Sequence, residues 1–172
     1  MKIVNALALV AAITLAGCSA EGATPASGLK VSSPAFADGA AIPRKHACAA
    51  QGGQDVSPPL KWSGVPSSAR ELAIVVDDPD APGGSYIHWL VTGVSTTATG
   101  AAEGEAPGRV VRGNGGDPAY AGPCPPSGVH HYHFIVYALP GPVVSSGGPQ
   151  EVHQRIKNSA IASGETIGTF AH

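Results

Sequence analysis

The hydrophobic pattern of this chain is mainly that of short strands separated by turns. An apolar run over residues 72–76 ends in the sequence Asp77-Asp78-Pro79-Asp80, and residues 86–94 form a second run a few positions later. Runs of this length bounded by acids and prolines predict a strand, a turn and a second strand. Because successive side chains of a strand point to opposite sides, the residues of the second strand divide between two faces. One face would carry Tyr86, His88, Leu90 and Thr92, and the other Ile87, Trp89 and Val91.

The turn between these two strands concentrates polar chemistry. Pro79 lacks a backbone N–H and has a fixed φ, so it holds the chain extended between Asp78 and Asp80. We therefore expect both carboxylates to face roughly the same way. His88, near the start of the second strand, would lie close to this acidic turn.

Other segments predict shorter strands. An edge strand is expected at residues 29–32, a brief one at 41–43 after a turn, and a last one at 166–170. Residues 55–62 contain two adjacent prolines followed by Trp62, which predicts an extended segment whose indole anchors the core.

A strongly apolar and aromatic strand is expected at residues 130–139, with His130 and Tyr132 on one face. The preceding segments, 95–108 and 113–128, are rich in glycine, and the second is also rich in proline, so both are expected to be loops. A long ordered loop without regular structure is usually functional.

One segment alone has clear helical spacing. Val152, Ile156 and Ile161 recur at helical intervals, which predicts a helix over residues 150–162. The content of 23 glycines and 16 prolines is otherwise typical of strands joined by turns, so the fold class is expected to be mainly β.

Length and charge limit the classes of function. A chain of 172 residues with 43% hydrophobic residues suits one domain with a real core. Charged residues make up 13% of the chain and the formal net charge is -2, so no basic surface for nucleic acid is expected.

The N-terminus has the layout of an export signal. Lys2 is followed by an apolar run over residues 3–16 and then by Gly17-Cys18, which resembles the bacterial lipobox. We therefore predict a lipoprotein signal peptide at 1–17, acylation of Cys18 with palmitate-type chains, a flexible tether at 18–28 and a folded domain at 29–172. A transmembrane helix is the weaker alternative because the run is short. An ordinary secretory peptide with an incidental cysteine is the other.

Histidines and aromatic residues gather in one third of the sequence. Four of the seven histidines and six of the nine aromatic residues lie within residues 86–137, just after Asp78 and Asp80. Each of these residues alone is weak evidence for a site, because a strand histidine is more often structural. Together they predict a pocket.

The motifs in this region resemble those of a known family. The sequences Asp78-Pro79-Asp80-Ala81-Pro82 and His88-Trp89, then residues 122–132, 55–62 and 168–170, are similar in order and spacing to the phosphatidylethanolamine-binding protein family, in its bacterial Raf kinase inhibitor-like branch. The resemblance implies a β-sandwich of two antiparallel sheets with Greek-key connections and a C-terminal helix. It also implies a small pocket for phosphate, a phosphoryl headgroup or an acetate-like anion.

Carried over position by position, the resemblance assigns the ligand-binding residues Asp78, Asp80, His88, Pro125, Pro126, His130 and Tyr132. The histidines and the tyrosine hydroxyl would donate hydrogen bonds to the anion. A carboxylate would repel the same anion unless it is protonated or the ligand carries a proton or an ammonium group. The chain departs from the family where it has His131 instead of the usual Arg, and Gly93-Val94 instead of an Asn-leading turn.

The cysteine count predicts one disulfide. If Cys18 is lipidated, Cys48 and Cys124 remain in an oxidising compartment, and secreted members of the resembling family are similar in having cysteines at these places. Two buried free thiols are the alternative.

Together, the export signal and the family resemblance predict an exported, lipid-anchored cell-envelope binding protein with a small-anion pocket. The hypothesis includes modulation of a partner protein, whose identity the sequence does not give. No cofactor and no metal is expected. The alternative is a hydrolytic enzyme that uses the Asp/His pocket for acid-base chemistry, although no nucleophile-elbow serine or HExxH motif occurs. A purely structural lipoprotein is a third reading.

Overall fold

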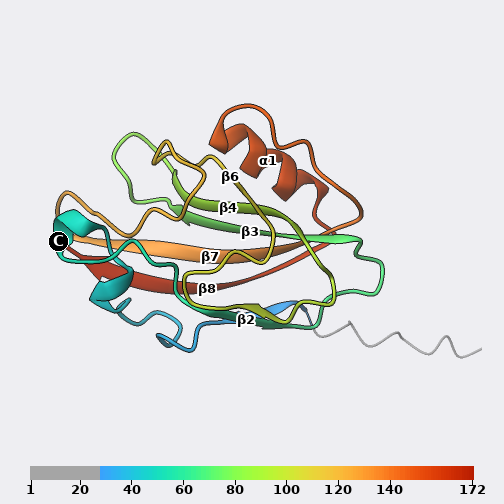
Figure 1. Cartoon of the computed structure of the whole chain (residues 1–172), viewed down its shortest axis with the longest axis horizontal. Coiled ribbons are helices and arrows are strands. Elements are labelled where there is room, and N and C mark those ends of the chain that lie inside the picture. Colours follow the sequence, from blue (N-terminus) through green and yellow to red (C-terminus); the bar gives the residue numbers. More distant parts are fainter. Residues whose placement is uncertain (1–27) are drawn as a thin grey trace, which may run out of the picture.

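A computed structural model describes residues 28–172, so the predicted signal peptide, Cys18 and nearly all of the tether lie outside the described residues. Two antiparallel sheets pack face to face, and one helix covers the outer face of the larger sheet (Figure 1). The smaller sheet has the order β1 (Lys30–Ser32), β2 (Leu60–Ser63), β5 (Gly100–Ala101). The larger has the order β6 (Arg109–Val111), β4 (Tyr86–Val94), β3 (Glu71–Asp78), β7 (Val129–Leu139), β8 (Ala162–Ala171). The mainly β prediction is confirmed.

The larger sheet contains a Greek key. Strands β3, β4 and β6 follow one another across the sheet, and β7 returns by a long connection to pair with β3 on its other side. The spatial order β7-β3-β4-β6 is that of four antiparallel strands in a Greek key. The loop that makes this return is the glycine- and proline-rich segment 112–128, which has no helix or strand, as its composition predicted.

Two apolar layers hold the three layers of structure together. Alternate residues of β3 and β7 point to opposite faces of the sheet. Ile74, Val76 and Phe134 pack between the sheets against Leu60 and Trp62 of β2. On the other face Ala73, Val75, Tyr137 and Leu139 pack against Val152 and Ile156 of the helix α1 (Pro149–Ser159). Trp62 is thus a core anchor, as predicted.

A β-bulge in β4 changes the predicted faces of that strand. Val76 pairs with Trp89 but Asp77 pairs with Ile87, so His88 is an extra residue in the ladder. Ile87 therefore packs under the helix, whereas Trp89 packs between the sheets. The prediction that these two residues share a face was wrong, because an inserted residue reverses the alternation on one side of the bulge.

Several element bounds also differ from the sequence prediction. The helix ends at Ser159, and Ile161, expected on its apolar face, is 44% exposed beyond it. Strand β8 begins at Ala162, four residues earlier than expected, because Ala162 to Ala171 pair continuously with β7. The segment at 41–43 forms only one isolated bridge, between Ala41 and Thr169, and the loop expected at 95–108 contains the short strand β5. Tertiary pairing, which local composition does not encode, decided each of these bounds.

Two short 3₁₀-helices, Arg44–His46 and Ala49–Gln51, lie in the connection between β1 and β2 and border the candidate site. Within residues 28–172, α1 and the other helices are too short to cross a membrane.

Candidate functional site

A cavity of about 400 Å³ lies where the larger sheet meets the two long loops. Its strand side carries Asp78, Tyr86, His88 and His130. Its loop side is formed by Asp55, Pro82, Ala121, Gly122, Pro125 and Pro126, together with the cysteine pair. Two larger hollows lie elsewhere, one on the smaller sheet and one beside α1. The cavity at Asp78 is the one that gathers buried ionisable side chains predicted to bind a ligand.

Asp78 and His130 form a buried pair at the base of this cavity. The Nδ1–H of His130 donates to Oδ2 of Asp78 across 2.7 Å, and the two residues are 7% and 3% exposed. The other oxygen of Asp78, Oδ1, accepts the backbone N–H of Asp80 across 2.9 Å. The negative charge of Asp78 is therefore directed at protein donors rather than at the open space of the cavity.

His88 reaches the cavity from the β4 bulge. Its Nδ1 lies 2.7 Å from the carbonyl oxygen of Ala121, and because a carbonyl only accepts, Nδ1 carries the proton. Burial lowers the pKa of His88, although the Ala121 hydrogen bond and the charge of Asp78 act in the opposite direction. A neutral His88 therefore has a bare Nε2, which can donate to a ligand only after protonation.

Tyr132 lies beneath the two histidines rather than on the cavity wall. It is fully buried, and its ring centroid is 5.1 Å from that of His88 and 6.4 Å from that of His130. Its hydroxyl has no hydrogen-bond partner within residues 28–172. Burial, reinforced by the charge of Asp78, raises the pKa of Tyr132 well above its ordinary value, so the phenol stays protonated. Its position suits a support for the imidazole rings.

Asp80 lies outside the cavity, on the surface. Its Oδ2 accepts both the backbone N–H and the Nδ1–H of His131, at 2.9 and 2.7 Å. These hydrogen bonds with His131 lower the pKa of Asp80. The two carboxylates do not face the same way, because the chain leaves β3 at Pro79 and the side chain of Asp78 caps the following turn. The expectation of a single acidic pair was wrong in this respect.

The loop wall is fixed by a disulfide and by Asp55. Cys48 and Cys124 are bonded, with their Cα atoms 5.5 Å apart, as the cysteine count predicted. Asp55 accepts the backbone N–H of Gly122 through Oδ1 at 2.8 Å and that of Ala49 through Oδ2 at 3.0 Å. A Cβ at Gly122 would lie 2.4 Å from the backbone of Ala47, so only glycine fits this close approach. Pro125 and Pro126 line the cavity where they were expected.

Sequence reasoning missed Asp55, Tyr86 and Gly122 as members of the site. Tyr86 could have been found, since it was predicted on the same strand face as His88, and its ring centroid lies 4.6 Å from that of His88. Asp55 stood in the resembling segment 55–62, but nothing local connects it to Gly122, which is 67 positions away. Within residues 28–172 no three histidine, cysteine or carboxylate side chains converge as metal ligands.

Comparison with known proteins identifies the family and the fold. The family model described as phosphatidylethanolamine-binding protein matches residues 32–171. A Mycobacterium tuberculosis protein named "Putative lipoprotein LppC" is 45% identical over 154 residues, which cover 86% of this chain and 75% of that protein. The crystal structure of E. coli YbcL, described as a member of the mammalian PEBP family, superposes with a TM-score of 0.78 at 29% identity. That match covers 85% of this chain and 99% of YbcL.

Proposed function

Because this chain belongs to the phosphatidylethanolamine-binding protein family, we propose that it is a lipid-anchored binding protein of the cell envelope. Its ligand is a small anion, either free phosphate or the phosphoryl headgroup of a phospholipid. The ligand occupies the cavity between Asp78, His88 and His130. A regulatory effect on a protein partner would follow from ligand occupancy, and the chemistry of the cavity does not specify that partner.

The observation that carries the proposal is the hydrogen bonding of the two imidazole rings. Both His88 and His130 use Nδ1–H for a protein acceptor, at 2.7 Å in each case. Each ring therefore has only Nε2 left for a ligand. Two Nε2–H groups on cationic imidazoles would form charge-assisted hydrogen bonds to one phosphoryl group.

This arrangement predicts that a proton accompanies the anion. His88 is neutral at pH 7 because burial lowers its pKa, so an anion must either raise that pKa and draw in a proton or bring a proton of its own. In both cases binding strengthens as the pH falls. Asp78 assists because it accepts from the Nδ1–H of His130 and so fixes the ring with Nε2 free for the ligand.

The remaining predicted residues have supporting roles in this proposal. Pro125 and Pro126 form an apolar wall that limits water in the cavity. Tyr132 packs beneath the imidazole rings and supports them. Asp80 does not contact the ligand but fixes the start of β7 through its hydrogen bond with His131.

The anchor is supported by the sequence and by a relative. Cys18 follows a signal-like run, and the similar M. tuberculosis protein has a name that describes it as a lipoprotein. We place the signal peptide at 1–17, the tether at 18–28 and the binding domain at 29–172. Two acyl chains on Cys18 would hold the domain at a membrane surface.

Hydrolysis is the weaker candidate. In the described part of the chain, no serine or threonine lines the cavity, and both cysteines at its wall are in the disulfide. The family is described as a binding protein, and no enzyme is named among the relatives reported above.

Calorimetric titration with inorganic phosphate and with phosphoethanolamine tests the proposal. We expect saturable binding to the wild-type protein and a loss of at least about tenfold in affinity for His88→Ala and for His130→Ala, since each removes a charge-assisted hydrogen bond of about 1.5 to 3 kcal/mol. His131→Ala is the matched control, because His131 forms an exposed pair with Asp80 outside the cavity and should not affect the affinity. Unchanged affinity in both pocket variants would show that the anion binds elsewhere.

A further inference from the structure

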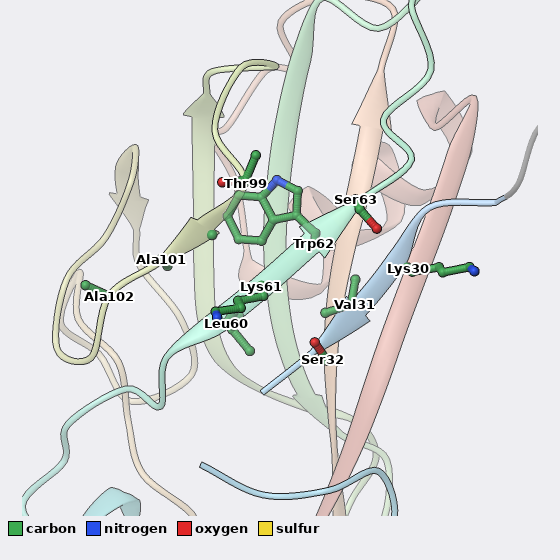
Figure 2. A pocket seen from close by; sticks show the side chains of 11 residues that line it. Lys30, Val31, Ser32, Leu60, Lys61, Trp62, Ser63, Thr99, Ala101 and Ala102 are labelled. Carbon is green, nitrogen blue, oxygen red and sulfur yellow. The ribbon is translucent and has the colours of Figure 1, made fainter. Parts of the chain in front are cut away.

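Among residues 28–172, nothing covers the outer face of the smaller sheet, and this face is basic. Lys30 of β1 is opposite Ser63 of β2, and Ser32 is opposite Lys61, so these four exposed residues form one face, which we call the basic sheet face. Figure 2 shows side chains of β1, β2 and the neighbouring segment 99–102 around the shallow hollow of about 950 Å³ on this sheet.

The charge of this face differs from that of the whole chain. No acidic side chain lines the hollow, and neither Lys30 nor Lys61 makes an ion pair with any residue in 28–172. The formal net charge of the chain is nevertheless -2. Two lysines without an acidic partner in residues 28–172 would therefore be attracted to an anionic surface that the rest of the protein tends to repel.

The position of this face relative to the proposed anchor is the second observation. Strand β1 starts at Lys30, which is only twelve residues after Cys18. Residues 18–28 would span at most about 35 Å when extended, and about 17 Å on average for a flexible chain. The segment contains a single charged residue, Glu21. An acyl chain on Cys18 would therefore keep the basic sheet face close to the bilayer.

We propose that the basic sheet face docks on the anionic surface of the membrane that holds the anchor. This inference rests on the lipid anchor of the proposed function and adds an orientation that the tether alone leaves free. Each lysine near an anionic bilayer favours docking by about 1 kcal/mol, or about 5.4-fold, so the pair would favour the docked state by about 30-fold. Salt would weaken docking because the attraction is screened within a Debye length.

The test uses the full, lipidated protein in vesicles. Ser32→Cys places one free thiol on the basic sheet face, and Ser159→Cys places a matched exposed thiol on α1, which covers the opposite side of the larger sheet. Each is labelled with an environment-sensitive dye. In vesicles of equal parts phosphatidylcholine and phosphatidylglycerol, we expect a blue shift for the label at position 32 and none at 159. The shift should disappear in pure phosphatidylcholine and at high salt.

Charge reversal gives an independent measurement. Lys61→Glu should lower the ratio of docked to free protein by about 30-fold, since the change moves two charges. The control, Lys157→Glu on the exposed surface of α1, changes the net charge equally and should leave the label at position 32 unaffected.

Three outcomes would overturn the docking proposal. Equal dye spectra in the two kinds of vesicle would show that the face does not bind anionic lipid. Equal responses at positions 32 and 159 would show that the domain has no preferred side. A shift that grows with the number of protein molecules per vesicle would identify a second copy of the chain as the occupant. Flotation of the wild-type protein with phosphatidylcholine vesicles tests the anchor separately, because it does not depend on the lysines.

Discussion

The Nδ1–H of His130 donates to Oδ2 of Asp78 across 2.7 Å, in a pair that joins the end of β3 to the start of β7. The two residues are 52 positions apart and come together because β3 and β7 are neighbours in the larger sheet, with both side chains on its inner face. The pair occupies Nδ1 of His130 and leaves Nε2 as the nitrogen that the proposed ligand would contact. In the proposed anion site, the carboxylate of Asp78 would therefore support the ligand indirectly, through His130, rather than repel it.

Asp78→Asn should weaken phosphate binding although it removes a negative charge from the cavity. The neutral amide leaves His130 without a counter-charge, so we expect at least about a tenfold loss of affinity and a loss of about 2 kcal/mol in the free energy of unfolding. Calorimetry and urea unfolding measure the two effects. Asp80→Asn, in the exposed pair with His131, is the control and should cost less than about 1 kcal/mol. Tighter binding by Asp78→Asn would contradict the assigned role.

Sulfate affinity should rise as the pH falls from about 7.5 to about 5.5, because His88 must gain a proton at Nε2 to donate. Sulfate has no pKa in this range, so any pH dependence comes from the protein. Calorimetry in buffers of different ionisation enthalpy should show proton uptake on binding. If phosphate shows the dependence and sulfate does not, the ligand rather than His88 supplies the proton.

The ligand-free protein should lose stability in mild acid. Burial lowers the pKa of both His88 and His153, so at pH values between the folded and unfolded pKa values the unfolded chain binds more protons. The contribution is fully favourable above the unfolded pKa of about 6.5 and declines as the pH falls below it. Thermal unfolding across this range should give a falling Tm, with a shallower decline in His88→Gln and in His153→Gln. A Tm that rises towards lower pH would contradict the predicted loss of stability in acid.

Cys48→Ala combined with Cys124→Ala should lower the free energy of unfolding by about 4 kcal/mol, because the bond closes a long loop between residues 76 positions apart. The pocket wall loses its covalent link as well, so anion affinity should fall together with stability. Guanidinium unfolding and calorimetry provide both values. Wild-type protein treated with a reductant is the matched comparison, and equal stability with and without the bond would contradict the prediction.

The mature protein should lack residues 1–17 and carry acyl chains on Cys18. Intact-mass spectrometry of the membrane fraction should give a mass that exceeds that of residues 18–172 by the mass of the attached lipid. Cys18→Ser should abolish the lipid and release the protein from the membrane. A membrane-fraction protein that retains Met1, or that bears no lipid, would disprove the anchor.

Several features could be predicted because they depend on local patterning. Alternation along 130–139 correctly placed His130 and Tyr132 on one face, since β7 is regular over its whole length. Glycine and proline content identified the loop before β7, and the parity of cysteines identified the pair Cys48 and Cys124. From the cavity wall the resemblance identified Asp78, His88, Pro125, Pro126 and His130, because its motifs cover the ends of three strands and the loop that faces them.

By itself, the amino-acid sequence determined the β class, the shared face of His130 and Tyr132 on β7, and the residue types available for binding an anion. Only the tertiary structure decided which of them meet. The β-bulge at His88 arises from the register in which β4 pairs with β3. The side chains of Asp78 and Asp80 are separated by a turn that Asp78 itself caps. The contact of Asp55 with Gly122 depends on two loops approaching each other across 67 positions of chain. Periodicity and spacing report what each residue does within its own segment, whereas register and loop packing are set by partners far away in the sequence.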